Sequence, residues 1–215
     1  MTNIEILLAN NLGAVIIVWA ITYAMDYYLM IIGARIYAAG AKQHFLFEEG
    51  YETAPEFKED VNALRLISPL LLRYIIGSSG IIIIVWLVAV RLLKYEEVFS
   101  VLIGGLFLRE AAIYLRHIRN IALFINARGE KGARGQVRYP RWFTMRISGI
   151  ELASFSLLYL LLFLLDKSWF FFGGVVACAA TAIQYFSVSN QTINREPRFE
   201  SREPVENETF MPDQD

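Results

Sequence analysis

The chain has 215 residues, of which 56% are hydrophobic and only 19% are charged, and its formal net charge is -1. This composition is too apolar for an ordinary soluble domain, and the balanced charge argues against a basic, nucleic-acid-binding protein. The single cysteine, Cys178, excludes an internal disulfide, and two histidines are too few for a typical zinc site, so no metal or cofactor is predicted.

The first apolar segment covers residues 12–34 and is interrupted only by Asp26. At about 1.5 Å per residue, this segment is long enough to cross roughly 30 Å of hydrocarbon as a helix. The residues before it include Glu5 but no Lys or Arg, so the positive start of a cleaved signal peptide is missing. We therefore expect the segment to remain in the mature protein.

A short amphipathic helix is predicted next, at residues 54–66. Thr53 and Glu56 have the spacing of a capping box, and apolar residues then recur at helical spacing. Because acidic residues surround this helix, an anionic membrane surface would repel it. Packing on the protein or on a partner is therefore one interpretation, and simple anchoring at the membrane interface is the other.

Four further apolar segments are predicted to span the membrane, at residues 70–90, 98–124, 142–165 and 169–185. Ser68 and Pro69 suit the N-cap and the first turn of the second span. Arg109 and Glu110 interrupt the third span, so four spans are an alternative to five. The predicted fold is an all-α membrane bundle of about five transmembrane helices, which occupies residues 1–186.

Lys and Arg gather in two loops, at residues 35–65 and 125–141, and such loops stay on the cytoplasmic side of a membrane. This pattern predicts an N-terminus outside and a C-terminus inside, in a plasma (inner) membrane. The remaining residues, 187–215, are rich in acids and poor in apolar side chains, which predicts a disordered cytoplasmic tail. The second loop also offers candidate contacts for anionic lipid headgroups: Arg128, Lys131, Arg134, Arg138 and Arg141.

Four ionisable residues fall within three of the predicted spans: Asp26, Arg109, Glu110 and Glu151. Counted from the predicted outer edge of each span, all of them lie about 17–21 Å deep. A charge that faces lipid at this depth costs at least about 3 kcal/mol, so we expect these side chains to face one another. Arg109 can neutralise only one carboxylate, so either at least one carboxyl is protonated or the site holds a cation.

Helical spacing predicts supporting polar residues around this charged layer: Tyr23, Tyr27, Tyr114, His117, Ser148 and Ser154. His117 is interpreted as a polar partner near the inner interface rather than as a metal ligand. Ion pairs inside a membrane also determine which helices pack together, so the layer has a structural interpretation besides a functional one. Small residues predict close helix packing at six positions: Gly77, Gly80, Gly104, Gly105, Gly173 and Ala177.

The sequence lacks the short motifs of phosphate loops, dinucleotide-binding folds, zinc proteases and serine hydrolases. The favoured function is a helical subunit or assembly protein that contacts the lipid bilayer and either copies of itself or another membrane protein. An alternative is a proton- or ion-conducting subunit that uses the charged layer. A lipid-modifying enzyme is the third possibility, and no nucleic-acid partner is expected.

Overall fold

The computed structural model describes residues 3–47, 57–128 and 135–195. Five helices within these ranges are long and apolar enough to cross a membrane, which confirms the all-α bundle with five candidate spans. In chain order they are α2 (Leu12–Ala38), α4 (Pro69–Val85) with its π-helical continuation η2 (Trp86–Leu92), α5 (Glu96–Ala127), α6 (Arg141–Asp166) and α7 (Trp169–Arg195). The shorter helices are α1 (Asn3–Asn10), η1 (Ala41–Gln43) and α3 (Lys58–Asn62).

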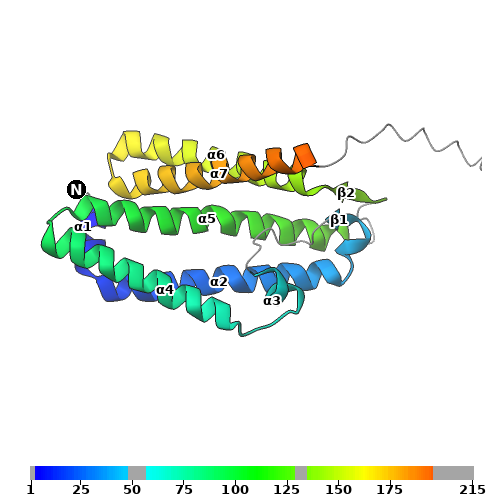
Figure 1. The fold of residues 1–215 in the computed structure, drawn as a ribbon, viewed down its shortest axis with the longest axis horizontal. Coiled ribbons are helices and arrows are strands. Elements are labelled where there is room, and N and C mark those ends of the chain that lie inside the picture. Colours follow the sequence, from blue (N-terminus) through cyan, green and yellow to red (C-terminus); the bar gives the residue numbers. More distant parts are fainter. Residues whose placement is uncertain (1–2, 48–56, 129–134, 196–215) are drawn as a thin grey trace, which may run out of the picture.

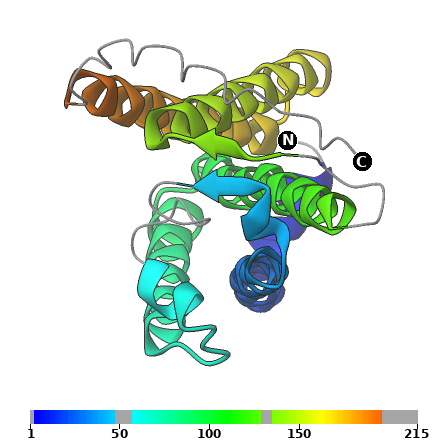
Figure 2. The same cartoon turned by 90° about the vertical axis from the view of Figure 1, so that its right-hand side faces the viewer.

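Helix α5 lies in the middle of the bundle. Figures 1 and 2 show α6 and α7 on one side of it and α2 and α4 on the other. Trp19 of α2 packs edge-on against Phe107 of α5, and Asp26 of α2 reaches His117 further along α5. These contacts show that α2 and α5 run side by side in the same direction.

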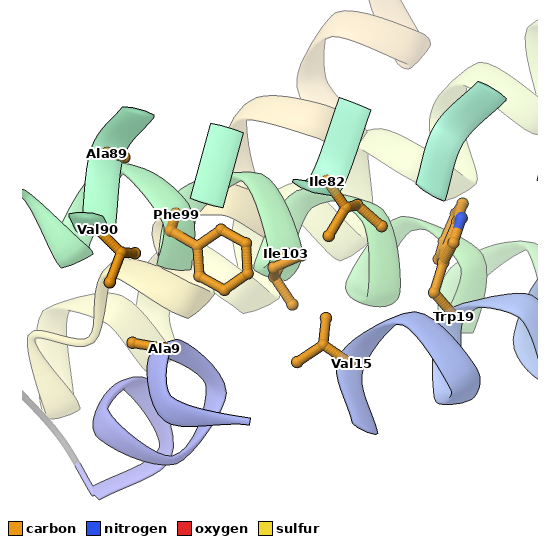
Figure 3. Close-up of a cluster of buried hydrophobic side chains, with 8 residues drawn as sticks. All are labelled: Ala9, Val15, Trp19, Ile82, Ala89, Val90, Phe99 and Ile103. Carbon is orange, nitrogen blue, oxygen red and sulfur yellow. The ribbon is translucent and has the colours of Figure 1, made fainter. Parts of the chain in front are cut away.

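Buried hydrophobic side chains gather near the start of α5. Figure 3 shows Val15 and Trp19 of α2 facing Ile82 of α4 and Phe99 and Ile103 of α5. The indole nitrogen of Trp19 donates a hydrogen bond to a serine hydroxyl of α4 at 2.7 Å. The cluster therefore joins three helices through apolar contact and also satisfies its one buried polar group.

Helices α5 and α7 approach so closely that their backbones touch. A Cβ atom at Gly104 would lie 1.9 Å from the carbonyl oxygen of Phe170, and one at Gly173 would lie 2.0 Å from that of Val101. Only glycine fits at such distances, so the predicted packing role of these residues is confirmed.

Gly77 and Gly80 on α4 behave differently. A Cβ atom at either position would meet nothing within 4 Å in the described part of the chain. Within the described residues no helix packs on these two glycines, so their predicted packing role stays a prediction. Small residues allow a close approach between helices, but they do not by themselves bring a second helix to the site.

Helix α1, which lies before the first predicted span, closes the end of the bundle near the start of α7. The Glu5 side chain is buried, and its Oε1 accepts hydrogen bonds from the Ser168 hydroxyl at 3.0 Å and from the Trp169 amide at 2.6 Å. A carboxylate in this place satisfies a free amide of the helix and interacts favourably with the helix dipole.

The opposite end carries a small sheet in which two loops meet. Strand β1 (Phe45–Phe47) pairs in parallel with β2 (Val137–Tyr139), and both rings of β1 pack against Phe124 near the end of α5. The two loops that are rich in Lys and Arg therefore lie at the same end of the bundle (Figure 1).

The predicted end of the last span is wrong. Helix α7 continues to Arg195 instead of ending near residue 185, so residues 187–195 are helical rather than part of a disordered tail. Ser189 is fully buried, and its hydroxyl donates to the carbonyl oxygen of Trp142 at 2.9 Å. Packing on the start of α6 thus supports the extra turns, whereas residues 196–215 lie outside the described part of the chain.

The predicted helix at 54–66 is shorter in the structure. Within the described residues it covers only Lys58–Asn62, and Leu64 then adopts a left-handed backbone with φ of 51°. The amide of Arg65 donates back to the carbonyl oxygen of Asp60 at 3.0 Å, which closes the turn. The proposed capping residues Thr53 and Glu56 lie outside the described residues.

Replacing Gly104 by Ala should lower the free energy of unfolding by about 3 kcal/mol or more, because the new methyl group would displace a helix backbone. Gly13→Ala is the matched control, since a Cβ at Gly13 meets nothing within 4 Å and its stability should not fall. Unfolding by SDS in mixed micelles measures both variants. Equal stability of the two variants would contradict the close contact between α5 and α7.

Candidate functional site

Three ion pairs surround α5 and involve all four charged residues that the sequence places within spans. The base of each pair belongs to α5, whereas the carboxylates come from α5, α2 and α6. The pairs are Arg109 with Glu110, His117 with Asp26, and Arg119 with Glu151. The three bases extend over about 15 Å of α5. Glu110 also interacts electrostatically with Asp26 and His117, so the shared layer of the four charged residues stays a prediction.

Glu110, which pairs with Arg109, is the most buried of the three carboxylates. Arg109 Nη2 donates to Glu110 Oε1 at 2.6 Å, and the exposed fractions of the two side chains are 33% and 2%. Neighbouring residues on a helix point in different directions, so the long arginine side chain bends back to make this contact. Among the described residues, the second oxygen, Glu110 Oε2, has no hydrogen-bond partner.

His117 and Asp26 link α5 to α2. Nε2 of His117 lies 3.2 Å from Oδ1 of Asp26, and only 3% and 14% of the two side chains are exposed. The contact is electrostatic rather than an aligned hydrogen bond, because neither this Oδ1 nor His117 Nδ1 finds a hydrogen-bond partner among the described residues. One turn earlier, the Tyr114 hydroxyl donates to the backbone carbonyl of Thr22, so the seam between the helices is polar over two contacts.

Arg119 and Glu151 join α5 to α6 in a more open position. The exposed fractions of their side chains are 48% and 27%, and Arg119 Nη2 also donates to Asn120 Oδ1 at 3.1 Å. A pair with this exposure contributes little to stability, typically about 1 kcal/mol or less. Among the described residues, the base that pairs with Glu151 is Arg119 and not Arg109.

The site contains two bases that the sequence-based charge balance did not count. Three carboxylates against one guanidinium would leave a negative excess, but His117 and Arg119 supply two further bases. Both bases lie further along α5 than Arg109 and Glu110. Their side chains reach back to Asp26 and Glu151. The two alternatives, a protonated carboxyl and a bound cation, stay predictions, and in the described residues there is no cluster of three or more His, Cys, Asp or Glu side chains that could hold a metal.

The predicted supporting residues divide into two groups. Tyr23 interacts electrostatically with Glu110, Asp26 and Arg109, so it lies beside the pairs, as Tyr114 does. Two others point elsewhere, which corrects their assignment: the Tyr27 hydroxyl donates to the carbonyl oxygen of Arg65 at 2.6 Å, and the exposed Ser154 donates to that of Ile150 at 2.9 Å. The helical period shows which residues share a face of one helix, but the direction of that face depends on how the neighbouring helices pack.

Three of the five basic residues predicted to contact lipid headgroups lie around the sheet end. Arg128 follows α5 and packs beside Gly40, Arg138 is exposed on β2, and Arg141 is the first residue of α6. Lys131 and Arg134 lie outside the described residues.

A cleft of about 250 Å³ opens between α5, α6 and the sheet. Its polar lining consists of Arg116, His117, Arg119, Asn120, Thr144 and Ser148. Of these, the sequence interpretation included His117 and Ser148 in the site and missed the others. The signal was present, because Arg116 and Asn120 are four residues apart on one helix, as are Thr144 and Ser148 on the next.

No protein-family model, curated protein or solved structure matches this chain.

Glu110→Gln should lower the free energy of unfolding by about 2 kcal/mol, because it leaves the guanidinium of Arg109, which is only one-third exposed, without its counter-charge. Glu151→Gln makes the same chemical change in a partly exposed pair and should cost less than about 1 kcal/mol. SDS unfolding of both variants in one detergent gives the comparison. Equal losses would contradict the difference in burial between the two pairs.

Proposed function

We propose that this chain is a multi-pass membrane protein that acts as a helical subunit or assembly protein. In this proposal, the intramembrane charges hold a defined helix arrangement for contact with other copies or with another membrane protein. The chain lies in a plasma (inner) membrane with its N-terminus outside and its C-terminus in the cytoplasm. The Lys- and Arg-rich loops at the sheet end of the bundle support this orientation.

The pairing of every intramembrane carboxylate with a base of its own supports this proposal most directly. Asp26, Glu110 and Glu151 each have a basic partner on α5. Two of these pairs join different helices, His117 with Asp26 and Arg119 with Glu151, whereas Arg109 and Glu110 both belong to α5. Because separating the buried pair of His117 and Asp26 would leave a carboxylate in a low-dielectric environment, this pair favours one rotation and one depth of α2 against α5. Paired charges are thus suited to a fixed architecture.

An exposed surface of small residues on α4 supports self-association. Only 17% of the apolar window of Pro69–Leu92 is buried, and a Cβ at Gly77 or Gly80 would meet nothing within 4 Å of the described chain. Glycines three or four residues apart let the backbone of a second helix approach closely in lipid. In our proposal, a helix of another subunit occupies this surface.

A proton- or ion-conducting subunit is the second candidate, and one observation favours it. Among the described residues, Glu110 Oε2 and His117 Nδ1 are buried and lack hydrogen-bond partners. Buried polar atoms without partners are costly unless water or a moving proton serves them. A water chain between the two ion pairs would satisfy both atoms and would provide a path for protons.

Proton flux into proteoliposomes separates the two candidates. For a packing role, wild-type vesicles should show no flux above protein-free vesicles, because paired charges with no continuous path do not conduct. Flux in wild type that Glu110→Gln abolishes, while the folded variant inserts normally, would support conduction instead. Arg146→Gln, an exposed change on α6, is the control for a general effect of charge.

Self-association in mild detergent should depend on the glycines of α4. Gly77→Leu and Gly80→Leu should each weaken association about tenfold or more, because the side chain separates two helix backbones. Leu72→Ile alters an exposed apolar residue on another face of the same helix and should leave association unchanged. Light scattering over a dilution series measures the mass, and a wild type that stays monomeric throughout would contradict the proposal.

A further inference from the structure

The cleft between α5, α6 and the sheet lies at the depth of the lipid headgroups. Helix α5 has 32 residues, which is about 48 Å and exceeds a hydrocarbon core of roughly 30 Å. Glu96 begins α5 next to the turn that follows η2, so we take it as the outer edge of the hydrocarbon. About 20 residues of helix cross the hydrocarbon, so its inner edge lies near Arg116. The cleft residues from Arg116 to Phe124 then lie where lipid phosphates are found.

The lining of the cleft is basic. Arg116, His117 and Arg119 contribute to it, and no Asp or Glu does among the described residues. Asp26 and Glu151, which pair with His117 and Arg119, lie outside the lining, and the Arg116 guanidinium also lies over the ring of Tyr185 at 6.0 Å. Arginine presents several N–H donors in a planar fork that matches the oxygens of a phosphate, so this lining suits a phosphate group.

The remaining lining indicates an amphiphilic ligand. Asn120, Thr144 and Ser148 add neutral polar groups, whereas Phe47 and Ile147 give the same cleft apolar walls. A volume of about 250 Å³ is below the roughly 300–1,000 Å³ of sites that enclose a drug-sized molecule. The space therefore fits a headgroup and its first carbons, with the rest of the ligand outside.

We propose that this cleft binds the phosphate of an anionic phospholipid, with the arginines contacting the phosphate oxygens and the apolar wall contacting the glycerol end of the acyl chains. The site differs from the loop residues that the sequence suggests for lipid contact, because α5 and α6 form it. It is also independent of the proposed packing role, since neither conduction nor self-association enters the argument.

Binding of short-chain lipids to the purified full chain in mild detergent tests the proposal. The probes are dioctanoyl phosphatidylglycerol, dioctanoyl phosphatidylcholine and inorganic phosphate, with affinity read by thermophoresis. Phosphatidylglycerol should bind about tenfold or more tightly than phosphatidylcholine, whose choline is repelled by the arginines. Arg116→Gln should weaken phosphatidylglycerol binding about tenfold.

Arg146→Gln is the matched control, because Arg146 is exposed on α6 beside the cleft residue Ile147 and does not line the cleft. Its affinity should stay within about twofold of wild type. Asn120→Leu keeps all charges, and weaker phosphatidylglycerol binding by this variant supports the site even if Arg116→Gln unfolds. Equal losses for Arg116→Gln and Arg146→Gln would overturn the proposal in favour of general surface charge. Inorganic phosphate that binds as tightly as the lipid would overturn the lipid assignment in favour of a soluble phosphate.

Discussion

A charge at the level of the hydrocarbon has to find its partner inside the protein, and in this chain the basic partners of three intramembrane carboxylates all belong to α5. This constraint explains why α5 is the central helix. Asp26 draws α2 to one side of it, and Glu151 draws α6 to the other. The contact of Asp26 with His117 is more buried than that of Glu151 with Arg119. The position of α2 against α5 therefore depends more strongly on its ion pair than the position of α6 does.

The charges alone do not hold α7, which carries no ion pair to α5 among the described residues and depends on shape instead. Gly104 and Gly173 remove the side chains that would otherwise keep the two backbones apart. Glu5 then fixes the start of α7 through a hydrogen bond to its first amide, and Ser189 fixes its far end to α6. Charge pairing and close backbone packing thus act on opposite sides of the same central helix.

Hydropathy was sufficient to predict the five spans, because the length and apolar character of a helix are properties of a local segment. The partners of the charged residues were not predictable in the same way. They depend on helix rotation and on the reach of a side chain such as Arg119, which meets Glu151 from a position beyond the counted layer. The glycines show the same limit, since Gly77 and Gly104 have similar sequence surroundings but only Gly104 touches another helix.

The basic residues near the end of α5 combine roles that sequence analysis treats separately. Positive residues at a membrane edge orient a chain whether or not they touch anything specific. A pure orientation signal, however, requires neither His117 to meet Asp26 nor Arg119 to meet Glu151, and it does not require a cleft with polar groups from a second helix. In the proposed orientation, α5 is longer than the hydrocarbon is thick, and its last turns would bring these side chains among lipid phosphates. The same residues that neutralise buried acids on one side can therefore meet an anion on the other.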